Sequence, residues 1–164
     1  MGAEGDLVDL RLGRGCRGFI GCVGGEVVGY AWLSTEAEWI GELGLEIRPP
    51  AGEAYVWNCF TLPAHRDRGY FRALLQQLVG AARDEGLTRL WIGAVDGGAE
   101  SAVTGTGFVP ALFFRTLTLG EVRWLSVRTP GGVDPTLLSA ARSTLIEGRS
   151  PDRWSVQRVQ TRRH

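Results

Sequence analysis

Apolar residues recur at helical spacing most clearly in residues 67–85. A continuous apolar stripe is what a helix needs in order to pack against a sheet. The stripe comprises Tyr70, Leu74, Leu78 and Ala81, widened by Phe71, Leu75 and Ala82. Gly86 stands where a C-terminal helix cap belongs. The pattern therefore predicts one amphipathic helix over this stretch.

Two strand-like segments flank the predicted helix. Residues 54–62 are rich in aromatic and β-branched side chains, which favour extended structure. Residues 89–95 form a continuous apolar run, as expected for a strand that is buried on both faces in a parallel sheet. Strand, helix and strand in this order predict a right-handed βαβ crossover.

The remaining patterns predict a mixed α/β fold. Residues 6–14 suit a helix or a strand about equally, and residues 36–46 are ambiguous. Gly24 and Gly25 fit the turn of a hairpin, because glycine supplies the positive φ that a tight turn needs. Asp134 is a typical helix N-cap. The other expected elements are strands at 16–23 and 27–34, a break at 48–52, a loop at 96–100, at most a short helix at 101–106, strands at 111–119 and 121–128, and a helix at 135–146.

Composition and charge narrow the class of protein. The chain has 164 residues, is 44% hydrophobic and carries no formal net charge. Balanced charge gives no overall attraction to nucleic acid or to an anionic membrane. No apolar run approaches the roughly 20 residues that span a bilayer. We expect one α/β domain with an appended C-terminal segment, in a cytoplasmic protein.

The cysteines and histidines do not form a metal-binding pattern. Cys16, Cys22 and Cys59 have no CxxC spacing, and the chain has 2 histidines. Neither a zinc site nor a disulfide framework is expected from this spacing. We interpret the three thiols as reduced core residues.

An arginine-rich turn around Gly69 opens directly into the predicted helix. The first N–H groups of a helix lack intrahelical partners, and the helix dipole adds to their positive field. Arg66, Arg68 and Arg72 add fork-shaped donors that suit phosphate oxygens. Arginines at a helix start oppose its dipole, and a bound anion would relieve that conflict. We favour an anion site over the alternative that Arg66 and Arg68 solvate a loop beside Asp67.

Residues 16–119 resemble a GNAT-type N-acyltransferase, the family that moves an acetyl or longer acyl group from coenzyme A to an amine. The family's most specific motif is Arg or Gln, two free positions, Gly, one free position, then Gly or Ala. Arg66 and Gly69 match it, whereas Phe71 replaces the second small residue. We expect the ring of Phe71 to point into the core; the alternative is that it crowds the phosphates.

The resemblance also rests on the order of the elements. A hairpin precedes the strand, Leu62 and Pro63 stand just ahead of the turn, and Gly107 and Phe108 follow the next strand. It implies a single GNAT-like domain, a mixed sheet with splayed central parallel strands, a shortened N-terminus and an added C-terminal helix. The expected division is a GNAT-like acyl-CoA-binding domain at residues 1–130 and a C-terminal helix with an arginine-rich tail at residues 131–164.

The resemblance implies a set of cofactor-binding residues. The backbone of the strand before the turn would bond the pantetheine arm and the thioester carbonyl, and the turn would hold the pyrophosphate. By position these residues are Cys59, Phe60, Thr61, Arg66, Asp67, Arg68, Gly69, Tyr70, Phe71 and Arg72. The implied co-substrate is acetyl-CoA or another acyl-CoA, without a metal.

Candidate proton-transfer groups lie on the same strand. Strand alternation predicts that Glu53, Tyr55, Trp57 and Cys59 share one face. If Cys59 lies at the thioester, Glu53 or Tyr55 would serve as general base. Cys59 itself is not expected to be a nucleophile, because a buried free thiol is the commoner case. No general acid is assigned, since only Ser101 and Thr104 stand near the position where the family often has a tyrosine.

The sequence thus predicts an N-acyltransferase that acts on a primary amine of a small molecule or a peptide. The alternative is a catalytically silent GNAT-like module that binds acyl-CoA or a protein partner. About fifteen residues precede the hairpin, fewer than is usual, and a homodimer is one way to supply the missing wall. For the arginine-rich residues 149–163 we expect a solvated tail; an RNA contact with Trp154 stacked on a base is the alternative.

Overall fold

The computed structural model describes residues 3–40, 43–95, 97–119, 122–145 and 155–158. The chain forms two compact units. The first unit comprises Met1–Ala37 and Pro49–Phe108, and the second comprises Glu38–Arg48 and Val109–His164. The two units are described separately below.

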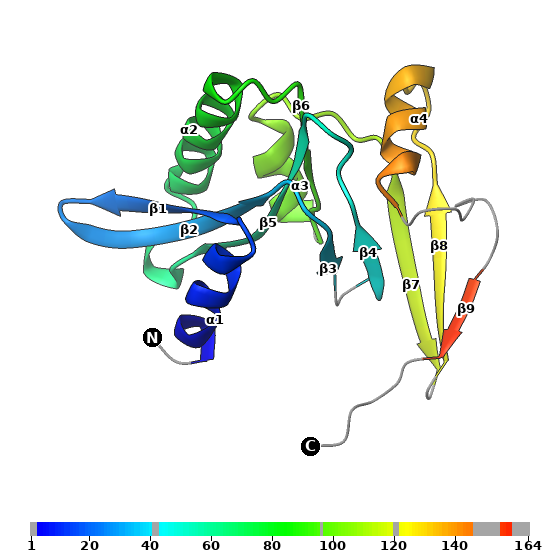
Figure 1. The fold of residues 1–164 in the computed structure, drawn as a ribbon, viewed down its shortest axis with the longest axis horizontal. Coiled ribbons are helices and arrows are strands. Elements are labelled where there is room, and N and C mark those ends of the chain that lie inside the picture. Colours follow the sequence, from blue (N-terminus) through cyan, green and yellow to red (C-terminus); the bar gives the residue numbers. More distant parts are fainter. Residues whose placement is uncertain (1–2, 41–42, 96, 120–121, 146–154, 159–164) are drawn as a thin grey trace. The chain divides into compact units, whose positions relative to one another are not determined.

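A mixed sheet organises the first unit (Figure 1). Its strands lie in the order β1 (Arg17–Val23), β2 (Glu26–Ser34), β5 (Glu53–Thr61) and β6 (Arg89–Ile92). β2 pairs antiparallel with β1 on one side and with β5 on the other, and β5 pairs parallel with β6. The predicted hairpin and the predicted βαβ crossover are both confirmed.

The helix of the crossover covers one face of this sheet. α2 (Tyr70–Asp84) buries the apolar stripe that its sequence predicts, and Leu74, Leu75 and Leu78 pack against alternate residues of β2 and β5. Those strand residues are Ala31, Leu33, Ala54 and Val56. The core of the first unit therefore lies between one helix and one sheet. Every second residue of the strands and one face of α2 supply its apolar side chains.

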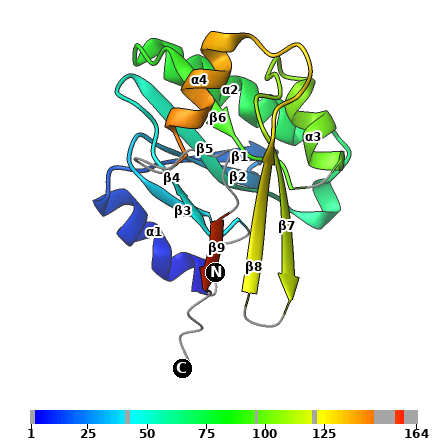
Figure 2. The same cartoon turned by 90° about the vertical axis from the view of Figure 1, so that its right-hand side faces the viewer.

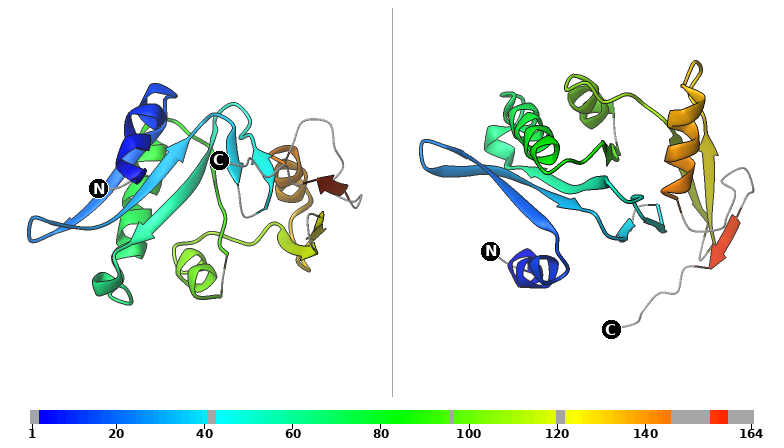
Figure 3. Two further views of the ribbon diagram at one scale, coloured as in Figure 1. Left: turned by 90° about the horizontal axis from the view of Figure 1, so that it is seen from below. Right: turned by 45° about the horizontal axis from the view of Figure 1, so that its top comes forward.

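The opposite face of the sheet carries aromatic residues and meets α1 (Ala3–Gly13) (Figure 3). The guanidinium of Arg11 lies 5.1 Å from the ring centroid of Trp32 and 4.9 Å from that of Trp57. Such cation–π contacts are strongest where water is excluded, and Arg11 is 7% exposed. Gly18 lies close beneath Trp32, because a Cβ there would stand 3.3 Å from the indole ring and would require a small shift of it. Residues 6–14, left open by their sequence, are thus helical and dock on the sheet.

α3 (Gly97–Thr104) completes the first unit and is longer than its sequence predicts. The two glycines at its start led us to expect a loop at 96–100, since glycine disfavours a helix interior. Val103 is buried in the core against α2, and this tertiary contact outweighs the local preference.

The described residues of the second unit form two small antiparallel sheets and one helix (Figure 2). β3 (Glu38–Ile40) pairs with β4 (Leu45–Ile47), so the described strand residues of the ambiguous stretch are 38–40 and 45–46. The other sheet has the order β7 (Phe113–Leu119), β8 (Val122–Arg128) and β9 (Ser155–Arg158). α4 (Pro135–Ser143) begins at the predicted cap, where the carboxylate of Asp134 accepts hydrogen bonds from the N–H groups of Thr136 and Leu137.

These elements confirm the predicted α/β class with a mixed sheet and an added C-terminal helix. The boundary at residue 130 stays a prediction. In the tail, residues 155–158 form β9 beside β8, whereas residues 149–154 and 159–163, Trp154 among them, lie outside the described residues. Within the described ranges no helix has both the length and the apolar character to cross a membrane.

Truncation of Leu78 should destabilise the first unit. Its side chain is fully buried beneath α2, so Leu78→Ala removes apolar contacts and leaves a cavity that costs about 2–5 kcal/mol. Urea unfolding followed by circular dichroism measures this change. Leu10→Ala is the matched control, because Leu10 is exposed on α1, and its free energy of unfolding should change by less than about 1 kcal/mol. Equal effects of the two substitutions would contradict the described core.

Candidate functional site

β5 leads into α2 through a turn with an unusual backbone. A short 3-10 turn, η1 (Pro63–His65), is followed by two residues with positive φ, Asp67 at 59° and Gly69 at 78°. Gly69 is the N-cap of α2 and adopts this conformation without steric conflict. A Cβ on Gly69 would have no atom within 4 Å, so the space above the turn is open.

The backbone N–H groups of residues 67–72 are unsatisfied. Within the described ranges none of them donates a hydrogen bond, and the first turn of α2 has no side-chain cap. The first bond of the helix runs from the N–H of Ala73 to the carbonyl of Gly69. Several free N–H groups at a positive helix end make an anion site.

The three arginines of the turn are exposed but differ in their surroundings. Arg66 folds back on β5: its Nε donates to the carbonyl of Thr61 at 3.2 Å, and its guanidinium lies 5.7 Å from the ring centroid of Phe60. Arg68 makes no hydrogen bond or ion pair to any described residue. Arg72 lies against Gly105 at the end of α3, where a Cβ would stand 2.6 Å from its Nη2.

The two aromatic residues after Gly69 point in different ways. The ring of Tyr70 lies 6.0 Å from that of His65 in a tilted arrangement. Phe71 packs against the core beneath α2, as expected, and does not crowd the turn. The missing second small residue of the motif is therefore compatible with an open anion site.

The pairing of β5 with β6 ends before β5 reaches the turn. Their parallel ladder has the pairs Glu53–Arg89, Ala54–Leu90, Tyr55–Trp91 and Val56–Ile92, and β5 then continues to Thr61. Among the described residues, no strand pairs with β5 on this side from Trp57 onward. The backbone of Cys59, Phe60 and Thr61 thus lies on an open edge of the sheet, and the predicted splay of the two parallel strands is present.

Cys59 does not lie on the predicted face of β5. Tyr30 pairs with Phe60 and Trp32 with Trp57, so residues 58 and 59 both stand opposite Ala31 in a β-bulge. Asn58 has a positive φ of 43° at this bulge. The extra residue reverses the alternation, and Cys59 packs against the core with Ala54 and Val56. The predicted shared face of Cys59 with Glu53, Tyr55 and Trp57 is therefore wrong.

Burial makes Cys59 a poor nucleophile. Its Sγ lies 3.7 Å from the carbonyl of Trp57, and desolvation raises the pKa of the thiol to about 12. Thiolate is the reactive form of cysteine, so almost none is present at neutral pH. This agrees with the expectation of a structural thiol at Cys59. The interpretation of all three thiols as core residues is wrong for Cys22, which is exposed.

The two candidate bases lie on the face opposite α2, at different distances from the open edge. Glu53 is 7% exposed and lies at the closed end of the ladder, where its carboxylate accepts hydrogen bonds from Arg89 and from Trp91. Tyr55 is buried two pairs nearer to the fork, the point beyond Val56 and Ile92 where the pairing of β5 and β6 ends. A Cβ on Gly93 would stand 3.0 Å from the hydroxyl oxygen of Tyr55. Tyr55 therefore reaches toward the point where the two strands part.

The residues near the expected general-acid position do not supply an obvious acid. Thr104 donates its hydroxyl to the carbonyls of Glu100 and Ser101 within α3, at 3.0 and 3.2 Å. Ser101 is exposed on the same helix. A hydroxyl that is already bonded to its own helix is a weak proton donor for a leaving group.

A comparison with known protein families identifies the family of this chain. The family model described as acetyltransferase (GNAT) family matches residues 4–103, which is more than half of the chain and includes β5, the turn and α2. The chain belongs to the GNAT acetyltransferase family. The resemblance predicted from Arg66 and Gly69 is confirmed.

Solved structures share the GNAT fold. An acetyltransferase from Trypanosoma brucei is 19% identical, with a TM-score of 0.50 over 70% of this chain and 75% of that chain. A candidate acetyltransferase from Agrobacterium tumefaciens is 21% identical, with a TM-score of 0.50 over 66% of this chain and 73% of that chain. The chain has no match among curated proteins.

The GNAT sequence pattern did not reveal every residue that shapes the site. Arg89 and Trp91 were interpreted only as part of an apolar strand, yet both bind Glu53. An arginine at the head of a buried strand was an available signal, because such a charge needs a nearby acid. The bulge at Asn58 left no comparable signal in the sequence.

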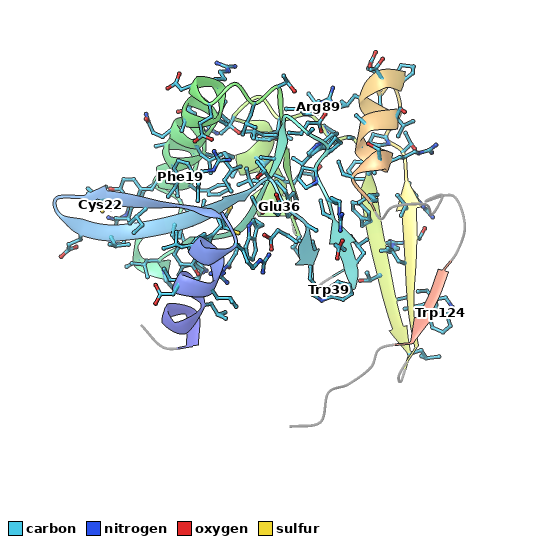
Figure 4. All side chains as sticks on the ribbon, in the orientation of Figure 1. Phe19, Cys22, Glu36, Trp39, Arg89 and Trp124 are labelled. Atoms are coloured by element: carbon cyan, nitrogen blue, oxygen red, sulfur yellow. The ribbon has the colours of Figure 1, made fainter. Side chains whose placement is uncertain are left out.

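Alkylation should separate Cys59 from Cys22, which is exposed near the tip of the β1–β2 hairpin (Figure 4). At pH 8 the raised pKa leaves a thiolate fraction of about 10⁻⁴ at Cys59, against roughly a quarter for an ordinary thiol. We expect iodoacetamide to label Cys22 within minutes and Cys59 only after unfolding in urea, as measured by peptide mass spectrometry. Labelling of both at one rate in the folded protein is inconsistent with this burial.

Proposed function

We propose that this GNAT protein transfers an acetyl group, or another acyl group, from coenzyme A to a primary amine of a small molecule or peptide. The observation that carries the proposal is the unsatisfied run of N–H groups at residues 67–72 beside an open strand edge. A pyrophosphate is dianionic and is best held by converging N–H groups at a helix start. Arg66 and Arg68 stand at the same turn to add charge-assisted hydrogen bonds.

The open edge of β5 would bind the rest of the acyl carrier. Extended amides such as those of pantetheine pair with a free strand edge in the way another strand would. The N–H groups between Cys59 and Thr61 would then face the arm, and one of them would polarise the thioester carbonyl. A backbone donor aimed at a developing oxyanion is typically worth a few kcal/mol of barrier. Holding both reactants at the fork would supply a further part of the rate through proximity.

Proton transfer is assigned to Tyr55. The acceptor ammonium must lose a proton before its nitrogen attacks the thioester carbon and the coenzyme A thiolate departs. The hydroxyl of Tyr55 lies next to Gly93 at the fork, whereas Glu53 lies at the closed end of the ladder, in the first β5–β6 pair. We therefore favour Tyr55 over Glu53 as the group that relays this proton, directly or through water.

A second candidate function is a silent module that binds acyl-CoA without turnover. The bonding of Thr104 to its own helix favours it, because the exposed Ser101 is then the remaining candidate of the two hydroxyls near the expected position of the general acid. This module would share the coenzyme site with the enzyme. The two functions differ in whether coenzyme A is released when an amine is added.

Loss of Arg66 should weaken coenzyme binding. Removing one charge-assisted phosphate contact costs about 1.5–3 kcal/mol, so Arg66→Ala should raise the Kd for acetyl-CoA roughly 10- to 100-fold in titration calorimetry. Arg83→Ala is the matched control, since Arg83 is exposed in the last turn of α2, and its Kd should match the unmodified protein. Equal Kd values for all three proteins would rule out this phosphate contact. Absence of acetyl-CoA binding by the unmodified protein would refute the proposed function.

Replacement of Tyr55 should affect turnover and not binding. With thiol detection of coenzyme A release over a panel of amines, Tyr55→Phe should lower kcat by roughly 10²- to 10⁴-fold while the Kd for acetyl-CoA stays within about twofold. Tyr30→Phe is the control, because Tyr30 lies on the same face and stacks on Phe60 at 5.7 Å. An unchanged kcat in Tyr55→Phe removes Tyr55 from the proton path. Binding of acetyl-CoA without release on any amine supports the silent module.

A further inference from the structure

Glu53, Arg89 and Trp91 form a closed cluster across the β5–β6 ladder. Arg89 Nη1 donates to one carboxylate oxygen of Glu53, and Trp91 Nε1 donates to the other at 2.6 Å. The guanidinium of Arg89 also lies 5.5 Å from the ring centroid of Trp91. All three side chains project from the face opposite α2, because their neighbours Ala54, Leu90 and Ile92 pack into the core. Arg89 is labelled in Figure 4.

The ladder that this cluster spans is short. It has four residue pairs, and its first pair joins Glu53 to Arg89. Parallel pairing is slightly less stable per residue than antiparallel pairing, so cross-strand side-chain contacts weigh heavily in such a ladder. A buried carboxylate that loses its partners is costly, and the three groups therefore hold one another in place.

The cluster connects to the fork through Tyr55. Trp91 is the ladder partner of Tyr55, and the hydroxyl of Tyr55 reaches Gly93, one residue beyond the end of β6. Glu53 lies three residues before the last pair, which is about 10 Å along a strand. Each step from Glu53 to the fork is a direct contact or a ladder pair.

We propose that Glu53, Arg89 and Trp91 form a clamp that fixes where β5 and β6 part, and that Glu53 is a positioning residue for the acyl-carrier site and not its general base. The inference rests on the proposed function, because it assigns the fork to the acyl carrier. In this arrangement the clamp holds the closed end of the ladder, so the backbone groups at Cys59–Thr61 keep the positions in which they would bind the pantetheine arm of the acyl carrier. Loss of the clamp lets the β5–β6 pairs open progressively toward Glu53, and the open edge of β5 then loses its fixed position.

The experiment compares Glu53→Gln and Trp91→Phe in the full chain. Trp91→Phe deletes one hydrogen bond and keeps the Arg89–Glu53 pair, so it is expected to fold even if Glu53→Gln does not. Each should raise the Kd for acetyl-CoA about three- to tenfold, the loss that one such hydrogen bond implies. The Kd of the double variant should exceed the higher of the two single-variant Kd values by no more than about twofold, because the two residues act as one unit. Hydrogen exchange at residues 54–56 and 90–92 should become faster in both.

Matched controls carry the same chemical changes elsewhere. Glu85→Gln breaks a half-exposed ion pair with Arg17, and Trp39→Phe alters an exposed indole in the second unit. Both should leave the Kd for acetyl-CoA and the exchange of the β5–β6 ladder unchanged. An effect as large as that of Trp91→Phe in either control would mean that the readout is not specific to the clamp, and would overturn the inference.

The outcomes separate the clamp from a general base. A base that faces the acceptor does not touch the carrier, so Glu53→Gln with unchanged Kd, unchanged ladder exchange and a kcat lowered by about 10²-fold would overturn the clamp. A Kd for acetyl-CoA that is close to the unmodified protein's in Glu53→Asp, but raised in Glu53→Ala, would support the clamp. If the unmodified protein does not bind acetyl-CoA, the proposed function fails, while the exchange data still test whether the three residues hold the ladder.

Discussion

The site depends on the early end of the pairing between β5 and β6. Four parallel pairs hold the strands together, and no described strand pairs with β5 on that side from Trp57 to Thr61. An unpaired edge is normally a liability, because it invites other strands. Here it stands beside a helix start whose N–H groups are also free. One crossover thus places this strand edge beside the free N–H groups of the helix start, which is the arrangement that the proposed coenzyme site requires.

The rigid part of this arrangement is the layer of α2 on the sheet. Leu74, Leu75 and Leu78 fix the helix against β2 and β5, so the first turn of α2 cannot move independently of the strand edge. The opposite face has another character: aromatic side chains of β2 and β5 meet a buried guanidinium from α1. The face of the sheet that α2 covers is thus an apolar layer, while the opposite face is aromatic and cationic.

Sequence periodicity was sufficient for the elements that bury a regular stripe. The helix at α2, the hairpin of β1 and β2 and the parallel strand β6 followed from spacing alone, and the motif around Gly69 led to the GNAT family. Prediction failed where tertiary contacts decided the outcome. Burial of Val103 stabilises α3 despite its glycines, and the bulge at Asn58 reverses the alternation that placed Cys59 beside Tyr55. The partners of Glu53 come from a strand that begins 36 residues further along the chain, and a single sequence does not indicate which strands pair.

The bulge at Asn58 gives β5 one more residue than regular pairing with β2 requires. Trp57 pairs with Trp32 and Phe60 pairs with Tyr30, so removal of Asn58 would make the ladder regular and would leave Cys59, Phe60 and Thr61 on the faces that they occupy now. A β-branched residue in place of Asn58 would instead be strained, because the backbone there has a positive φ of 43°. Loss of this residue is therefore a smaller disturbance to the sheet than such a substitution.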